Sequence, residues 1–338
     1  MGYRLEADES VPKGLRRIVR EEIESAEEYL GGKKDGGPDE AIHEARKSIK
    51  KIRAVLRLAQ AELGGTYAKE NDGLRTIAAD LSEIRDAAAI IETFDALPDA
   101  KNFAPVRQRL IERKKQMEAA KDRDAVMKQA GLALRRLGKR ARTWPIKTTG
   151  FEAIAPGLEG CYRKGRRAMK VAGEEQTPES FHEWRKRVKD HWYHTRLIES
   201  LWTEEMQARE KSLKELETWL GDDHNLAVLR GLVSAEPAAF GETAIVDALL
   251  DRIDDREKAL RRNSLSLGAR LYDEKPKRFR RRVEHLWQEW QERPMDLEKE
   301  EVEAGKSGDA ACQATKTETG RKPASKARRS ARRTARVA

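Results

Sequence analysis

Two stretches of this sequence, IHEARK at residues 42–47 and FHEWRK at residues 181–186, match each other at an offset of 139 residues. The same offset aligns residues 74–86 with residues 213–225, and no gap is needed. Self-similarity at a fixed offset is the signature of a repeated supersecondary unit. We therefore predict that the chain contains two copies of one helical unit.

Apolar residues in both copies recur at steps of three and four, which places them on one face of a helix. This seam predicts a helix packed in a bundle, with the seam in the core. In the first copy the seam consists of Ile42, Ala45, Ile49, Ile52, Leu56, Ala59 and Leu63. In the second copy it consists of Phe181, Trp184, Val188, His191, Thr195 and Ile198.

Composition supports an all-α fold. Charged residues make up 38% of the 338 residues and apolar residues another 38%, which favours thin cores between long amphipathic helices. No segment alternates apolar and polar residues with period two, so strands are not predicted. The predicted helices span 12–30, 39–63, 67–96, 104–142, 151–172, 179–201, 204–220, 223–233, 241–272 and 276–291.

The net charge of +10 is concentrated at the carboxyl end. Residues 305–338 carry ten Lys and Arg against two Asp and Glu, which leaves +2 for the first 304 residues. We predict a first helical half at 1–143, a second half at 144–293 and a disordered basic tail at 294–338. No signal peptide or long apolar run occurs, so we expect a cytoplasmic protein without membrane insertion.

Basic residues form a second stripe in each copy, about 100° around the helix from the seam. The first stripe consists of His43, Arg46, Lys50, Arg53 and Arg57, with Lys47 beside it, and the second of His182, Arg185, Lys189, Trp192 and Arg196. Neither stripe contains an acid, although like charges at helical spacing repel. A solvated basic face is the simple explanation for one copy, but its repetition with histidine in register favours a polyanion as partner. Arg85 and the aligned His224, on the third helix of each copy, could face the same ligand.

Signatures of catalysis and of cofactor binding are missing. The sequence has no GxxxxGK[ST] phosphate loop, no GxSxG and no HExxH motif. His182 is nine and twelve residues from His191 and His194, which is not the spacing of metal ligands on one helix. We therefore expect no enzyme activity, no metal and no cofactor.

Several segments resemble the conserved histidine α-helical domain, or CHAD, family. The resemblance covers roughly residues 1–291 and includes the residues of both repeats in order. The matching segments are GYRLEADESVPKGLRRIV at 2–19, IHEARKSIKKIRAVLRL at 42–58, LSEIRDAAAI at 81–90, GLEGCYRKGRRAM at 157–169, FHEWRKRVKDHWYHTRLI at 181–198 and LGDDHNLAVL at 220–229.

This resemblance implies two antiparallel helical bundles related by pseudo-twofold symmetry, with a basic groove or pore that binds inorganic polyphosphate. It also implies association with polyphosphate granules. Trp192 and Asp190 depart from the basic pattern of the first copy, so the second half presents fewer charges. The implied ligand-binding residues are His43, Arg46, Lys47, Lys50, Arg53, Arg57, Arg85, Arg163, Arg166, Arg167, His182, Arg185, Lys186, Lys189, Arg196 and His224.

Two other classes of function stay open at this point. The tail carries Lys326, Arg328 and Arg329 among small residues, and such a tail binds nucleic acids weakly through their phosphates. Alternatively, the bundles form a scaffold that recruits other proteins. Polyphosphate has no bases, so a site for it needs no stacking platform, which agrees with an aromatic content of only 6%.

Overall fold

The structure, a computed structural model, describes residues 2–119 and 122–293, apart from the side chains of residues 83–86 and 118–119. Within this part of the chain the secondary structure is helical and contains no strand, which confirms the predicted fold class. Residues 1–291 form one compact unit. The predicted tail at 294–338 lies outside the described residues, and the division of the preceding part into two halves stays a prediction. No described helix is both long and apolar enough to cross a membrane.

Three pairs of helices reproduce the 139-residue offset. The equivalent helices α2 and α8 pack against each other, and so do α4 and α9. Contacts between equivalent elements are expected where two copies are related by an approximate two-fold axis. The pairs are α1 (Val11–Leu30) with α7 (Ala155–Glu175), α2 (Gly37–Leu58) with α8 (Pro178–Leu197), and α4 (Gly65–Asp95) with α9 (Thr203–Ala235).

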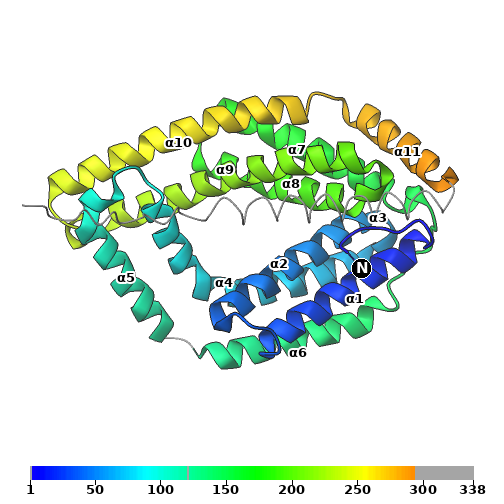
Figure 1. Cartoon of the computed structure of the whole chain (residues 1–338), viewed down its shortest axis with the longest axis horizontal. Helices are drawn as coiled ribbons and strands as arrows, with labels where there is room; N and C mark the ends of the chain where they lie inside the picture. Colours follow the sequence, from blue (N-terminus) through cyan, green and yellow to red (C-terminus); the bar gives the residue numbers. More distant parts are fainter. Residues whose placement is uncertain (1, 120–121, 294–338) are drawn as a thin grey trace, which may run out of the picture. The chain divides into compact units, whose positions relative to one another are not determined.

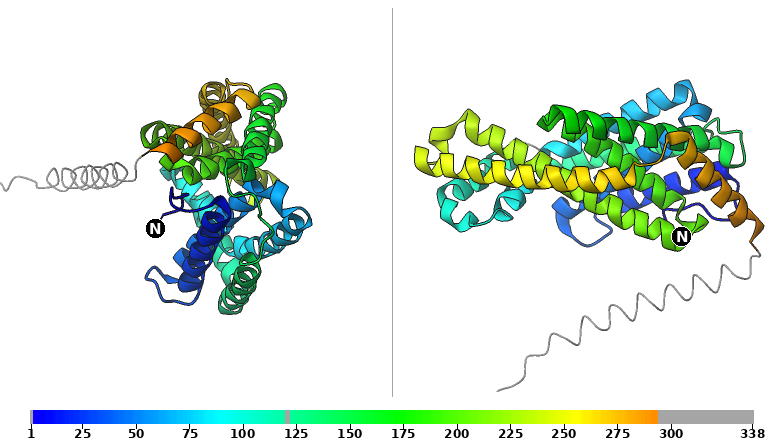
Figure 2. Two further views of the ribbon diagram at one scale, coloured as in Figure 1. Left: turned by 90° about the vertical axis from the view of Figure 1, so that its right-hand side faces the viewer. Right: turned by 90° about the horizontal axis from the view of Figure 1, so that it is seen from above.

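The two copies differ after their third helix. In the first copy two helices follow, and the second of them, α6, packs against α1 and α4. In the second copy a long helix, α10, runs along α9 and is followed by α11 (Figures 1 and 2). The remaining helices are α3 (Gln60–Leu63), α5 (Ala104–Ala119), α6 (Arg123–Ala141), α10 (Thr243–Leu271) and α11 (Pro276–Glu292). Short 3₁₀ turns span Ala100–Phe103, Phe151–Ala153, Glu199–Leu201 and Pro237–Ala239.

Two predicted helices are each divided in the structure. The segment predicted as one helix at 39–63 consists of α2 and α3, and the segment at 104–142 consists of α5 and α6. The start of α6 has a local cause, because the side chain of Asp122 accepts a hydrogen bond from the backbone N–H of Ala125 at 3.0 Å. Such a cap satisfies a donor that has no partner inside the helix.

Conversely, the two helices predicted at 204–220 and 223–233 are one continuous helix, α9. Gly221 lies at the predicted break, but the helix continues through it. A Cβ atom at this position would lie 3.0 Å from Nη2 of Arg185. The glycine therefore makes room for the guanidinium group of a neighbouring helix.

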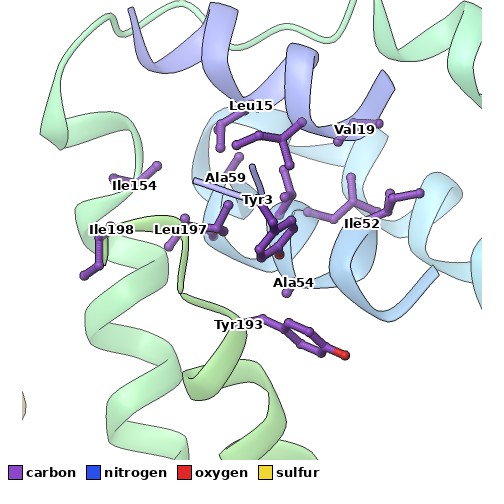
Figure 3. Close-up of a cluster of buried hydrophobic side chains, with 14 of the residues drawn as sticks. Tyr3, Leu15, Val19, Ile52, Ala54, Ala59, Ile154, Tyr193, Leu197 and Ile198 are labelled. Carbon is purple, nitrogen blue, oxygen red and sulfur yellow. The ribbon is translucent and has the colours of Figure 1, made fainter. Parts of the chain in front are cut away.

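The predicted seams form the main hydrophobic core. Ile42, Ile49 and Ile52 are fully buried, as are Phe181 and Trp184 in the second copy. Figure 3 shows part of this core, in which side chains of α1 and α2 lie near those of the end of α8. The burial of both seams confirms the sequence prediction.

A second, separate core lies at the far ends of the third helices. There Phe94 of α4 and Val106 of α5 join Leu229 of α9 and Leu249 of α10 in one cluster. Residues from both copies thus contribute to the same core. The two copies are held together at this end as well as along α2 and α8.

A close backbone contact joins α7 to the end of α2. A Cβ atom at Gly157, in the first turn of α7, would lie 2.0 Å from the carbonyl oxygen of Leu58. Only glycine permits this approach, since the obstacle is backbone and cannot rotate away.

We predict that Gly157→Ala destabilises the protein by at least about 2 kcal/mol, because the new methyl group overlaps a fixed carbonyl. As a control, Gly73→Ala in the interior of α4 meets nothing within 4 Å. It should stabilise the protein by about 0.5–1 kcal/mol through the higher helix propensity of alanine. Chemical denaturation of both variants measures the two free energies, and equal effects would contradict the close contact.

Candidate functional site

Four cationic side chains of the predicted stripes lie together where α2 packs against α8. Arg46 and Lys50 belong to α2, and Arg185 and Lys189 are their equivalents on α8. All four side chains are half-buried. We call these four residues the central basic cluster.

Lys50 experiences the charge of this cluster most strongly. Burial lowers its pKa first, and the neighbouring charges of Lys189, Arg46 and Arg185 lower it further, to about 7. Glu217 is the one acid among the groups that shift it, and its effect is too weak to compensate. Near neutral pH, the free protein therefore holds a positive charge here at a considerable cost in free energy.

An acid from another helix neutralises part of the cluster. Glu217 of α9 is 5% exposed, and its carboxylate lies 3.0 Å from Nζ of Lys189 and 3.3 Å from Nη2 of Arg185. Lys214 also contacts it at 2.9 Å. Burial would raise the pKa of Glu217, but these cations outweigh it and lower the pKa to about 2. The basic stripe of α8 contains no acid, but the neighbouring helix α9 supplies Glu217.

Sequence reasoning missed Glu217 because it considered only acids on the same helix as the stripe. The offset of 139 aligns Glu217 with Ala78. The first copy therefore has no carboxylate at the equivalent position. This difference between Glu217 and Ala78 was the signal in the sequence that the second copy alone has an acid at this position.

Two of the predicted histidines lie against each other beside the cluster, with their rings tilted. The ring centroids of His182 and His224 are 3.9 Å apart. Burial lowers the pKa of both rings, and the neighbouring cations lower them further, so that the pKa of His224 falls to about 4. Both rings are therefore largely neutral at pH 7 in the free protein, and they can act as hydrogen-bonding groups without adding charge.

The far ends of the two stripes have partners within the protein. Nε of Arg53 donates to Asn71 at 3.1 Å, and burial lowers the pKa of Arg53 to about 10. Arg57 lies 3.0 Å from Asp190, and Arg196 lies 3.1 Å from a carboxylate oxygen of Glu210. The aligned residues Arg57 and Arg196 are thus both neutralised by acids.

Other predicted residues lie at the surface beside acids of their own helix. Lys47 contacts Glu44 at 3.1 Å, and Lys186 contacts Glu183 at 3.2 Å. His43 lies 3.9 Å from Glu44. Exposed pairs of this kind contribute about 0–1 kcal/mol, so these side chains can change partner easily.

The predicted arginines of α7 make contacts outside the central basic cluster. Arg163 lies 3.4 Å from Glu159, and Nε of Arg166 donates to the backbone carbonyl of Tyr272 at 3.0 Å. Arg167 is exposed. The side chain of Arg85 lies outside the described residues.

The remaining buried histidines serve packing. His191 and His194 are 1% and 0% exposed, and Nε2 of His194 lies 2.9 Å from the carbonyl oxygen of Ala54. The seam position of His191 is as predicted, and of the surface and packing positions left open for His194 the structure shows packing. In the described part of the chain, no group of three His, Cys, Asp or Glu side chains is arranged to hold a metal ion.

Comparison with known proteins identifies the family. The family model for the CHAD domain matches residues 17–234. This chain belongs to the CHAD family. The fold is also similar to the crystal structure of the CHAD domain from the plant Ricinus communis, with a TM-score of 0.62 and 18% identity over 80% of this chain and 94% of that chain. A search of curated proteins found no match.

In this CHAD domain the carboxylate of Glu217 should make stability depend on acid pH. Its pKa lies below the ordinary value of 4.5, so its stabilising effect is present above pH 4.5 and is lost as the pH falls toward 2. The lowered pKa corresponds to a contribution on the order of 3 kcal/mol. Glu217→Gln should remove most of this pH dependence, as measured by urea unfolding at several pH values. Glu215→Gln, an exposed acid of the same helix, is the matched control, and an equal loss there would contradict the assignment.

Proposed function

We propose that this CHAD protein binds inorganic polyphosphate through the central basic cluster and does not cleave it. The lowered pKa of Lys50 carries the proposal. Packing places Lys50 near three other cations, and one carboxylate is the only acid among the groups that shift its pKa. A polyanion bound here would relieve this repulsion, since it supplies more negative charge than the single carboxylate of Glu217.

A phosphate polymer suits the cluster because its charge repeats along the chain. Each unit presents anionic oxygens to which arginine and lysine donate charge-assisted hydrogen bonds, worth about 1.5–3 kcal/mol each. Several contacts of this strength in sequence produce tight binding overall. The neutral rings of His182 and His224 lie beside the cluster and add donors to the same oxygens.

Binding without catalysis and a cytoplasmic location at polyphosphate granules are parts of the same proposal. The sequence lacks the phosphate loop and the other catalytic motifs that would activate a water or a nucleophile. A fluorescent fusion of the full chain tests the location, because it should coincide with stained granules and lose that coincidence when the cluster is neutralised.

Neutralising one arginine from each copy, Arg46→Gln with Arg185→Gln, should weaken binding of long-chain polyphosphate on the order of 100-fold, since two charge-assisted contacts are lost. Titration calorimetry at several salt concentrations measures this, and the double variant should also show a smaller salt dependence. The control is Lys128→Gln with Lys170→Gln, which removes the same charge from exposed positions on α6 and α7. Equal losses in the two double variants would show that binding follows net charge rather than this site.

Binding should also be coupled to proton uptake at Lys50. Bound phosphate raises a pKa that is about 7 in the free protein, so affinity is highest below pH 7 and falls as the pH rises toward the bound-state value. Calorimetry in buffers of different ionisation enthalpy counts the protons taken up at pH 7.5. Lys50→Arg keeps the charge but does not titrate, and should abolish this uptake while retaining most of the affinity. Unchanged proton uptake in this variant would assign it to another group.

A further inference from the structure

A buried ion pair joins α9 to α10 in the second copy. Asp223 of α9 is buried, and its carboxylate accepts a hydrogen bond from Nε of Arg261 on α10 at 2.7 Å. The offset of 139 aligns Asp223 with Ile84, so the first copy has an apolar residue at the equivalent position. A buried charge that loses its partner is strongly unfavourable, so this pair fixes the two helices relative to each other.

Arg261 also holds the corner between α7 and α8. Its Nη1 donates a hydrogen bond at 2.9 Å to the backbone carbonyl of Gln176, the residue that follows α7. Gln176 has a φ of +53°, which is unfavourable for a residue with a side chain and needs support from its surroundings. The guanidinium group of Arg261 lies over the ring of Phe181 near the start of α8, 5.0 Å from its centroid. One side chain of α10 therefore contacts the end of α7, the start of α8 and the middle of α9.

The residues that Arg261 contacts are sequence neighbours of His182 and His224, which we call the histidine pair. On α8, Phe181 immediately precedes His182. On α9, Asp223 immediately precedes His224. Successive residues of a helix point about 100° apart, so one residue of each helix contacts α10 while the next contributes to the histidine pair. A shift of either helix turn would separate the two imidazole rings.

The same turn of α9 supports the central basic cluster. Gly221 lies two residues before Asp223, and a Cβ atom at Gly221 would lie 3.0 Å from Nη2 of Arg185. The guanidinium group of Arg185 therefore packs directly against this turn. A displacement of the turn would move His224 and the surface behind Arg185 together.

The other charges of this region do not replace Arg261. Burial raises the pKa of Asp223, and the hydrogen bond from Arg261 is the main effect that opposes this rise, with a weaker one from the charge of Arg230. Arg230 itself donates a hydrogen bond to Glu257 at 2.8 Å. Without Arg261, the buried carboxylate of Asp223 would have to take up a proton or move toward water.

We propose that Arg261 is a positioning residue for the histidine pair, on which it acts through Asp223 and Phe181 without touching the ligand. By holding α9 to α10 and to the start of α8, it keeps the two rings in contact beside the central basic cluster. This effect concerns the free protein. Only its consequence for ligand binding rests on the proposed function.

Arg261→Gln tests the position of the rings in the full-length free protein, with the histidine signals followed in an NMR titration. The pKa of His224 is about 4 because its ring is buried beside His182 and the cations of α8. When the rings separate and contact water, this pKa should move at least halfway toward the ordinary value of 6.5. Arg262→Gln, which removes the same charge from an exposed neighbouring position, should leave the titration unchanged. A folded Arg261→Gln variant with unchanged titration of the histidine pair would overturn the proposal, even if its stability is reduced.

The reciprocal variant Asp223→Ala keeps the test decisive where Arg261→Gln does not fold. It removes the buried carboxylate and leaves Arg261 with Glu257 as a neighbouring acid, 4.0 Å away. We expect the pKa of His224 to rise in this variant also, because the link between α9 and α10 is lost. Arg261→Lys keeps the charge beside Asp223 and should retain most of the lowered pKa. An unchanged titration in a folded Asp223→Ala variant would overturn the proposal.

Titration calorimetry with long-chain polyphosphate tests the consequence for binding. Arg261→Gln and Asp223→Ala should each weaken binding at least about fivefold, the equivalent of one hydrogen bond, and Arg262→Gln should change it little. Equal binding by the unaltered protein and by variants with displaced rings would overturn the positioning role in the site. If the unaltered protein does not bind polyphosphate, the proposed function fails, and the NMR titrations still decide whether Arg261 positions the rings.

Discussion

The packing of α2 against α8 is the constraint on which the charge distribution of this protein depends. Each helix buries an apolar seam, and the cationic residues lie about 100° from that seam. When the two equivalent helices meet, Lys50 and Lys189 come to lie in the same half-buried region. Burial of the two seams stabilises an arrangement that electrostatic repulsion alone would separate. The lowered pKa of Lys50 is the direct result.

The two copies differ in how they compensate this repulsion. The second copy supplies Glu217, and the first copy has Ala78 at the equivalent position. Asp190 of the second copy stands where the first has Lys51, and its carboxylate neutralises Arg57 of the first copy. The two copies are therefore more alike in their aligned sequence than in the distribution of their charges. The excess of positive charge falls near Lys50.

Helices and seams could be predicted because both depend on spacing within one segment. The breaks between helices were harder, as α9 shows. The two helices predicted at 204–220 and 223–233 form one helix, in which Gly221 lies against Arg185 of another helix. Asp122, by contrast, caps α6 through a contact three residues away, and this local signal was present in the sequence.

The sequence by itself determined that the chain is helical, that it contains a repeated unit, and that a basic stripe flanks each seam. These features are local, because periodicity along one helix decides which residues share a face. Only the tertiary structure decided which cations are neutralised and which keep their charge unbalanced. That outcome depends on contacts between distant residues, such as Arg185 with Glu217 and Arg57 with Asp190. No spacing rule within a single helix encodes such contacts, since they are set by how the helices pack.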